Sequence, residues 1–89
     1  MFEWDTSKAA GNHAKHGVSF EEAATVFGDS EALDGPDLSH SEKESRLLRL
    51  GRAVTGRVLI VAYTVRRRDD DESIRIISAR RASRQERAG

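Results

Sequence analysis

Apolar and polar residues in the first part of the chain are spaced as in a short strand followed by a helix. Residues 2–4 alternate between apolar and acidic side chains, as a strand does. Asp5 is a favourable N-cap, and the alanine-rich stretch after it predicts a helix that runs through Lys15. Gly17 is expected to stop this helix, because glycine adopts the left-handed conformation at low cost. The pattern therefore predicts a strand, a helix and a sharp turn.

A second helix is predicted directly after that turn. Ser19 and Glu22 have the spacing of a capping box, in which each side chain satisfies a backbone N–H group of the other residue. Gly28 is expected to end the helix. Its apolar stripe at helical spacing consists of Phe20, Ala23, Ala24 and Phe27. This stripe indicates the side of the helix that faces the core.

The remainder of the chain has the pattern of strands joined by hairpins. The predicted strands are residues 31–34 (a brief edge strand), 46–53, 57–65 and 74–81. Residues 66–72 are so highly charged that we expect a self-neutralising loop that does not pack. A last helical turn or two is predicted over residues 82–88, with Ser83 as the cap and Glu86 completing a capping box.

The fold class that follows is α+β. We expect a small antiparallel sheet of three to four strands with two N-terminal helices packed on one face, and a short C-terminal helix, in a single domain over residues 1–89. The other face of the sheet is left open. Its expected polar members are Arg46, Arg49 or Arg52, Tyr63, Arg75, and the pair Arg80 and Arg81. Because the central strand is apolar on both sides, the pattern does not determine which set of side chains faces outward.

The composition narrows the class of protein. A chain of 89 residues has room for one core, and 37% apolar with 34% charged residues is typical of a small soluble domain. The chain has no cysteine, which excludes disulfides and cysteine metal sites and is compatible with a reducing cytoplasm. No run approaches the roughly 20 apolar residues of a membrane helix. The acidic first five residues do not form a signal peptide, so we expect a cytoplasmic protein.

The net charge of zero conceals a strong asymmetry between the two halves. Residues 1–45 carry three lysines against ten acidic residues, and residues 46–89 carry twelve arginines against five acidic residues. The halves therefore have charges of −7 and +7. An anionic partner of the second half is one explanation, and arginine favours forked contacts to phosphate. The alternative is that the acidic half folds against the basic half and neutralises it.

Two long motifs give the chain a family resemblance. The first comprises residues 2–5, Lys8, Asn12, residues 15–23 and Phe27, and the second comprises Arg46, Tyr63 and Thr64, residues 74–82, Glu86 and Arg87. Together they span nearly the whole chain, and they resemble the BrnT family of toxins. One departure concerns the end of the sequence. Family members continue past the Glu-Arg motif with further basic residues and a tyrosine, so we expect any contact made by that tail to be missing here.

The resemblance implies a fold, an activity and a partner. The implied fold is RelE-like, and the implied activity is that of a ribonuclease toxin from a type II toxin–antitoxin pair. The implied partner is a BrnA-like antitoxin with a ribbon-helix-helix DNA-binding domain, through which the toxin would meet operator DNA only indirectly. RNA is the implied substrate. The resemblance leaves open whether the toxin forms a homodimer or joins the antitoxin in a heterotetramer.

Cleavage of RNA without a metal ion requires an activated ribose 2′-hydroxyl, a stabilised phosphorane and a protonated 5′-oxygen. His16 is the natural acid or base, since histidine titrates near neutral pH, and Lys15 lies next to it. The alternative is that His16 only caps the last carbonyl groups of its helix. No cofactor is expected. His13 and His16 have the spacing of two metal ligands, but no third ligand is evident, and the segment Ser39-His40-Ser41 has no acid partner for a nucleophile.

The arginines are the expected phosphate ligands. Arg75 and Arg80 are assigned to the catalytic clamp together with His16 and Lys15, and Arg46 and Arg81 are assigned to RNA binding. Internal salt bridges are the alternative for each arginine. Tyr63 is expected either to stack on an RNA base or to be a core tyrosine with a bonded hydroxyl. Two hypotheses remain: a metal-independent endoribonuclease, and a non-catalytic module that binds RNA or a protein through its arginine-rich sheet face.

Overall fold

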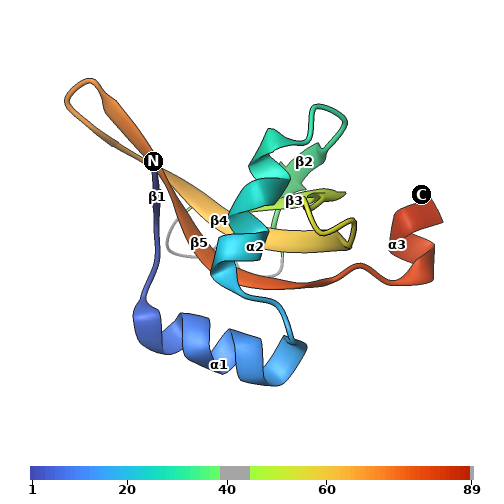
Figure 1. Ribbon diagram of the computed structural model, residues 1–89. Helices are drawn as coiled ribbons and strands as arrows, with labels where there is room; N and C mark the ends of the chain where they lie inside the picture. The colour runs from blue at the N-terminus through green and yellow to red at the C-terminus, as the bar shows by residue number, and fades with distance from the viewer. Residues whose placement is uncertain (39–44, 89) are drawn as a thin grey trace.

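Five strands form one sheet in the part of the chain that the structure describes, residues 1–38 and 45–88 (Figure 1). The structure is a computed structural model. The strand order is β1-β5-β4-β3-β2. The strands are β1 (Phe2–Glu3), β2 (Leu33–Pro36), β3 (Leu47–Arg52), β4 (Val58–Arg68) and β5 (Asp71–Arg81). The helices are α1 (Thr6–His16), α2 (Phe20–Thr25), the 3-10 turn η1 (Val26–Gly28) and α3 (Arg84–Ala88).

The α+β class is confirmed, but the expected purely antiparallel sheet of three to four strands is corrected to a mixed sheet of five. β1 pairs with β5 in parallel, with Phe2 opposite Ile74 and Glu3 opposite Arg75. The other strand pairs are antiparallel. The two helices lead from β1 to β2 at the opposite edge of the sheet, and the chain then passes through β3 and β4 to β5. Three successive antiparallel pairings give β5 the same direction as β1, so these two strands pair in parallel.

The predicted loop over residues 66–72 is the largest local error. Strands β4 and β5 continue through this run, with Arg67 opposite Glu72 and Arg68 opposite Asp71. Only the turn itself is irregular, and Asp69 adopts a positive φ of 53° there. Arg67 and Glu72 form an ion pair of 3.1 Å. Opposite charges on facing strands stabilise a hairpin, so the self-neutralising charge pattern extends the strands instead of ending them.

The helix termini follow the sequence prediction. The Asp5 side chain accepts a hydrogen bond from the Lys8 N–H group at 3.0 Å, and Gly17 stops α1 with a φ of 69°. Ser19 caps α2 by accepting from the Glu22 N–H group at 3.0 Å. The Glu22 carboxylate does not complete a capping box with Ser19, however, because it binds the Arg57 guanidinium instead. The predicted second helix also tightens into η1 before Gly28.

Both α2 and η1 cover one face of the sheet, and α1 lies beside β5 (Figure 1). The core between helices and sheet consists mainly of Val18, Phe20, Ala23, Val26, Leu59, Val61, Ile76 and Ala79. A close approach at Gly51 allows this packing, because a Cβ there would lie only 2.8 Å from Val26 Cγ1. Within the described residues, no helix is long and apolar enough to cross a membrane.

The strand register determines which side chains face away from the helices. Directly paired residues share a face, and consecutive residues alternate between faces. Leu50, Ile60 and Arg80 form one such row on the open face, and Leu48, Ala62 and Ser78 form the next row. An extra residue in β5, Ile77, then shifts the register. Of the arginines and the tyrosine expected on the open face, Arg49, Tyr63 and Arg81 lie instead on the helix-covered side.

Candidate active site

A shallow cavity of about 330 Å³ lies on the open face of the sheet and brings together three of the predicted site residues. His16 comes from the end of α1, Arg46 from the residue before β3, and Arg80 from the last part of β5. The remaining lining residues are Asp37, Leu48, Ile60, Ala62, Ile77, Ser78 and Ala79. The cavity therefore has an apolar floor of sheet side chains and charged groups that arrive from three separate elements.

His16 is held at this cavity by a hydrogen-bonded anchor one helical turn earlier. Asn12 is 8% exposed, and its amide bonds both backbone groups of Ala79: it donates to the carbonyl at 2.8 Å and accepts from the N–H group at 3.1 Å. It also donates to the Val18 carbonyl at 3.0 Å. Residues four apart lie on the same side of a helix. The Asn12 contacts thus hold the end of α1 against β5, where His16 lines the same cavity as Arg80, the residue after Ala79.

The described part of β1 pairs only with Ile74 and Arg75, so the backbone of Ala79 lies beyond its reach. Backbone N–H and carbonyl groups that are buried at the edge of a sheet without hydrogen-bond partners lower the stability of a protein. The Asn12 amide presents one donor and one acceptor, and it takes the place of a neighbouring strand at this point. This explains a polar side chain buried in the middle of α1, and it shows why α1 is fixed so tightly to the end of β5.

Arg46 and Asp37 lie side by side at another wall of the cavity. The Asp37 N–H group donates to the Arg46 carbonyl at 2.9 Å, and the Asp37 side chain is only 6% exposed. Within residues 1–38 and 45–88, no ion pair or hydrogen bond engages the Arg46 guanidinium. Asp37 is a second titratable group in the cavity besides His16. No pattern in the sequence points to Asp37, since it stands in a polar stretch next to Pro36.

The Arg80 guanidinium is held by a carboxylate. Its two terminal nitrogens donate to the two oxygens of Glu86, both at 2.8 Å. Glu86 also accepts from the Ser83 N–H group at 2.7 Å, which completes the predicted capping box of α3. The hydrogen bonds from Arg80 and Ser83 lower the pKa of Glu86 to about 2. The forked geometry is the one that arginine also uses for phosphate.

Arg75 and Lys15 lie outside the cavity, which corrects the expectation that they share one site with His16 and Arg80. Arg75 is on the open face, opposite Thr64 and further along β5, and its guanidinium lies 3.6 Å from the Glu3 carboxylate. Lys15 is exposed on α1 and does not line the cavity. For Arg75 the alternative of an internal salt bridge therefore describes the structure.

Tyr63 is a core residue, and the expectation that it stacks on an RNA base is corrected. Its side chain is 5% exposed and its ring packs edge-on against Phe27, with the ring centroids 4.9 Å apart. The hydroxyl donates to Asp34, which also binds Arg49 through a forked pair. Burial and the Asp34 carboxylate raise the pKa of Tyr63 to about 12. This arrangement matches the alternative of a core tyrosine with a bonded hydroxyl.

Arg81 points to the helix-covered side at the end of β5 and lines a separate groove with Arg57. It therefore does not join Arg80 at the cavity. Among the described residues, no group of three or more metal-ligating side chains comes together, and His13 is exposed. The segment Ser39-His40-Ser41 lies outside the described residues.

Comparison with known proteins decides between the two hypotheses. A family model described as "Ribonuclease toxin, BrnT, of type II toxin-antitoxin system" matches residues 4–86. The chain belongs to the BrnT family. A crystal structure of the Brucella abortus ribonuclease toxin BrnT is similar, with a TM-score of 0.66 and 26% sequence identity over 94% of this chain and 99% of that one. No curated protein matches the sequence.

BrnT family membership makes the chain an endoribonuclease toxin of a type II toxin–antitoxin system, with an RNA substrate and an antitoxin partner. The hypothesis of a non-catalytic module is therefore set aside. The family resemblance of the two sequence motifs is confirmed. Six residues of these motifs line the cavity: His16, Arg46, Ile77, Ser78, Ala79 and Arg80.

Proposed function

We propose that this BrnT protein cleaves messenger RNA without a metal ion, by attack of a ribose 2′-hydroxyl on the adjacent phosphate, in the cavity lined by His16, Arg46 and Arg80. The single observation that supports this site most directly is the convergence of these three side chains from different elements on one concave part of the open face. The cut would stop translation, and a BrnA-like ribbon-helix-helix antitoxin would neutralise the toxin.

Proton transfer is assigned to the two titratable groups of the cavity. One of His16 and Asp37 takes the proton of the 2′-hydroxyl as its oxygen bonds to phosphorus, and the other gives a proton to the 5′-oxygen as its bond to phosphorus breaks. The products are a 2′,3′-cyclic phosphate and a 5′-hydroxyl end. Both groups line the same cavity, which supports this assignment, because one group must act as base while the other acts as acid.

The arginines are assigned the role of stabilising the negative charge that develops on the phosphorane. Arg46 has no ion-pair partner within the described residues, so it is available to a phosphate oxygen. Arg80 requires an exchange, since its fork is held by Glu86, and the RNA phosphate must replace that carboxylate. Phosphate and carboxylate occupy the same forked donor set, which supports the exchange. Arg75 extends the basic open face toward β1 and is proposed to contact the RNA outside the cleavage site.

The experiment is cleavage of a single-stranded RNA by the purified protein, with product ends identified by mass spectrometry. We expect cyclic phosphate ends, and the same rate with and without EDTA. His16→Ala should lower the cleavage rate about 10²- to 10⁴-fold, the usual contribution of one acid–base group. Arg46→Ala should lower it about 10²- to 10³-fold, as for one group that stabilises an oxyanion. Arg67→Ala, on the distant β4–β5 hairpin, is the matched control.

Two results would contradict the proposal. A His16→Ala protein that cleaves at the wild-type rate would remove His16 from the chemistry. Cleavage of a substrate that carries a 2′-deoxyribose at the cut site would exclude attack by the 2′-hydroxyl. Circular dichroism of each variant confirms that the fold is intact before rates are compared.

A further inference from the structure

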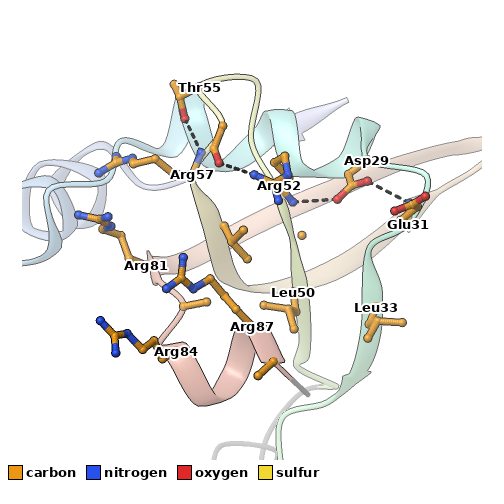
Figure 2. A pocket seen from close by; sticks show the side chains of 15 residues that line it. Asp29, Glu31, Leu33, Leu50, Arg52, Thr55, Arg57, Arg81, Arg84 and Arg87 are labelled. Atoms are coloured by element: carbon orange, nitrogen blue, oxygen red, sulfur yellow. Dashed lines mark hydrogen bonds between the residues drawn. The ribbon is translucent and has the colours of Figure 1, made fainter.

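An open groove of about 1130 Å³ lies beside the active-site cavity, between α3 and strands β2 and β3 (Figure 2). Its apolar part is formed by Leu33, Leu50, Val58, Ala82 and Ala88. Leu33 belongs to the edge strand β2 and is 62% exposed. Figure 1 shows α3 standing off the end of the sheet, and no residue of this helix is buried. One wall of the groove is thus a short helix with no core of its own.

The charges around the groove are mostly positive and only partly neutralised. Five arginines line it: Arg52, Arg57, Arg81, Arg84 and Arg87. Arg57 is paired with Glu22, and the Arg52 guanidinium donates to the Gly56 carbonyl at 2.8 Å. Within the described residues, the side chains of Arg81, Arg84 and Arg87 have neither a hydrogen bond nor an ion pair. Figure 2 shows these three along one side of the groove, from the end of β5 to α3.

The chemistry of the groove favours a protein segment over RNA. Single-stranded RNA is often held on exposed aromatic rings, but none of the residues that line this groove in the described part of the chain is aromatic. An apolar floor beside unpaired arginines instead complements an amphipathic segment that has leucine-like anchors on one side and carboxylates on the other. The acid content of such a segment would match the three unpaired arginines.

We propose that this groove, lined by Leu33, Leu50, Val58, Arg84 and Arg87, is the docking site for an acidic amphipathic segment of the antitoxin. That a segment bound in the groove inhibits the toxin rests on the proposed function, which places RNA cleavage in the neighbouring cavity. Arg80 shares a sheet row with Leu50 and is tied to α3 through Glu86, so the groove adjoins the active-site cavity. A segment bound there covers Arg80 and blocks the access of RNA.

The experiment measures the affinity of the toxin for the antitoxin protein encoded beside its gene, by biolayer interferometry. We expect Arg84→Ser/Arg87→Ser to weaken binding about tenfold or more, in line with the loss of interfacial charge contacts. Leu33→Asp, on the other wall, should weaken it similarly by adding a like charge to an apolar contact. Leu33 is largely exposed, so this variant is expected to fold even if changes in α3 prove disruptive. Arg67→Ser/Arg68→Ser on the β4–β5 hairpin is the matched control and should bind normally.

RNA cleavage by the same variants separates this inference from the proposed function. Variants that still cleave RNA but escape the antitoxin support the groove as the docking site. Unchanged antitoxin affinity in both groove variants would overturn it. Loss of RNA binding with normal antitoxin affinity would also overturn it, and would assign the groove to RNA. A toxin dimer that the groove variants dissociate in light scattering would show that a second copy of the chain occupies the groove. If the wild type fails to cleave RNA, only the proposed function fails, because antitoxin affinity is measured independently.

Discussion

Asn12 shows how one side chain can position another, here His16, the proposed acid or base, without touching it. Its amide satisfies the N–H and carbonyl groups of Ala79 and the carbonyl of Val18, all inside the protein. Asparagine is unfavourable within a helix, because its side chain competes for backbone hydrogen bonds. In this protein the Asn12 side chain instead forms its hydrogen bonds with the backbone of β5, so the hydrogen bonds of α1 are not disturbed. Since His16 follows one turn later, the same contacts determine its place at the cavity.

We predict that Asn12→Ala lowers the free energy of unfolding by about 2 to 4 kcal/mol, because each buried backbone group left unpaired costs about 1 to 3 kcal/mol. Urea denaturation monitored by circular dichroism measures this. Where the variant is still folded, its cleavage rate should also fall, since His16 is no longer held next to Arg80. His13→Ala, on the exposed side of the same helix, is the control. An Asn12→Ala protein with normal stability would contradict the role of the amide.

At the scale of single elements, one residue of α3, Glu86, links this helix to Arg80 of the proposed active site. Glu86 caps α3 with Ser83 and holds Arg80 with both carboxylate oxygens. The pKa of Glu86 is lowered from 4.5 to about 2, so the stability contributed by this contact is present above pH 4.5 and is lost as the pH falls toward 2. Changes of pH near neutrality are therefore not expected to break the contact between Glu86 and Arg80, whereas an anion that competes for the guanidinium would.

We predict that Glu86→Gln tightens RNA binding several-fold, because a neutral amide competes less well than a carboxylate for the Arg80 guanidinium. Fluorescence anisotropy with a short RNA that is 2′-O-methylated at every ribose measures binding without cleavage. Glu72→Gln, which weakens the ion pair with Arg67 on the distant hairpin, is the matched control. Weaker RNA binding by Glu86→Gln would show that the carboxylate holds Arg80 in its productive position instead of competing with the substrate.

The elements that the sequence predicts well are those with local causes. The stop at Gly17 and the caps at Asp5, Ser19 and Ser83 depend on residues within a few positions of each other. The parallel pairing of β1 with β5 joins residues over 70 positions apart, and no local pattern contains it. The loop predicted over residues 66–72 is wrong, because a run of charges is not by itself a sign of irregular structure: here the charges pair across two strands.

At the scale of the whole molecule, the acidic and basic halves of the chain neutralise each other only in part. Several arginines of the second half neutralise acids of the first, as in the pairs of Arg57 with Glu22 and of Arg49 with Asp34. Others, including Arg46 and Arg84, have no ion-pair partner within the described residues. The unneutralised charge lies on the open face and around the groove, where an anionic partner has access.

The sequence predicts that the site contains a histidine and arginines, but it identifies only some of the residues that line the cavity. The sequence motifs named His16, Arg46 and Arg80, which the fold brings to one cavity. Arg81 and Tyr63 were expected on the same face of the sheet as Arg80, but the alternation of side chains along β4 and β5 places them on the other face. Asp37 was missed because only its position in the folded chain shows that it lines the cavity.

The most direct test of the account is induced expression in a bacterial host, with growth rate and primer extension on total RNA measured together. The wild-type chain is compared with a His16→Ala/Arg80→Ala double variant that is shown to be soluble and folded. We predict that the wild type arrests growth and produces discrete cuts in messenger RNA, and that the double variant does neither. Arrest and cuts that persist in the double variant would place the active site elsewhere. Normal growth and intact RNA with soluble wild-type protein would contradict the proposed function itself.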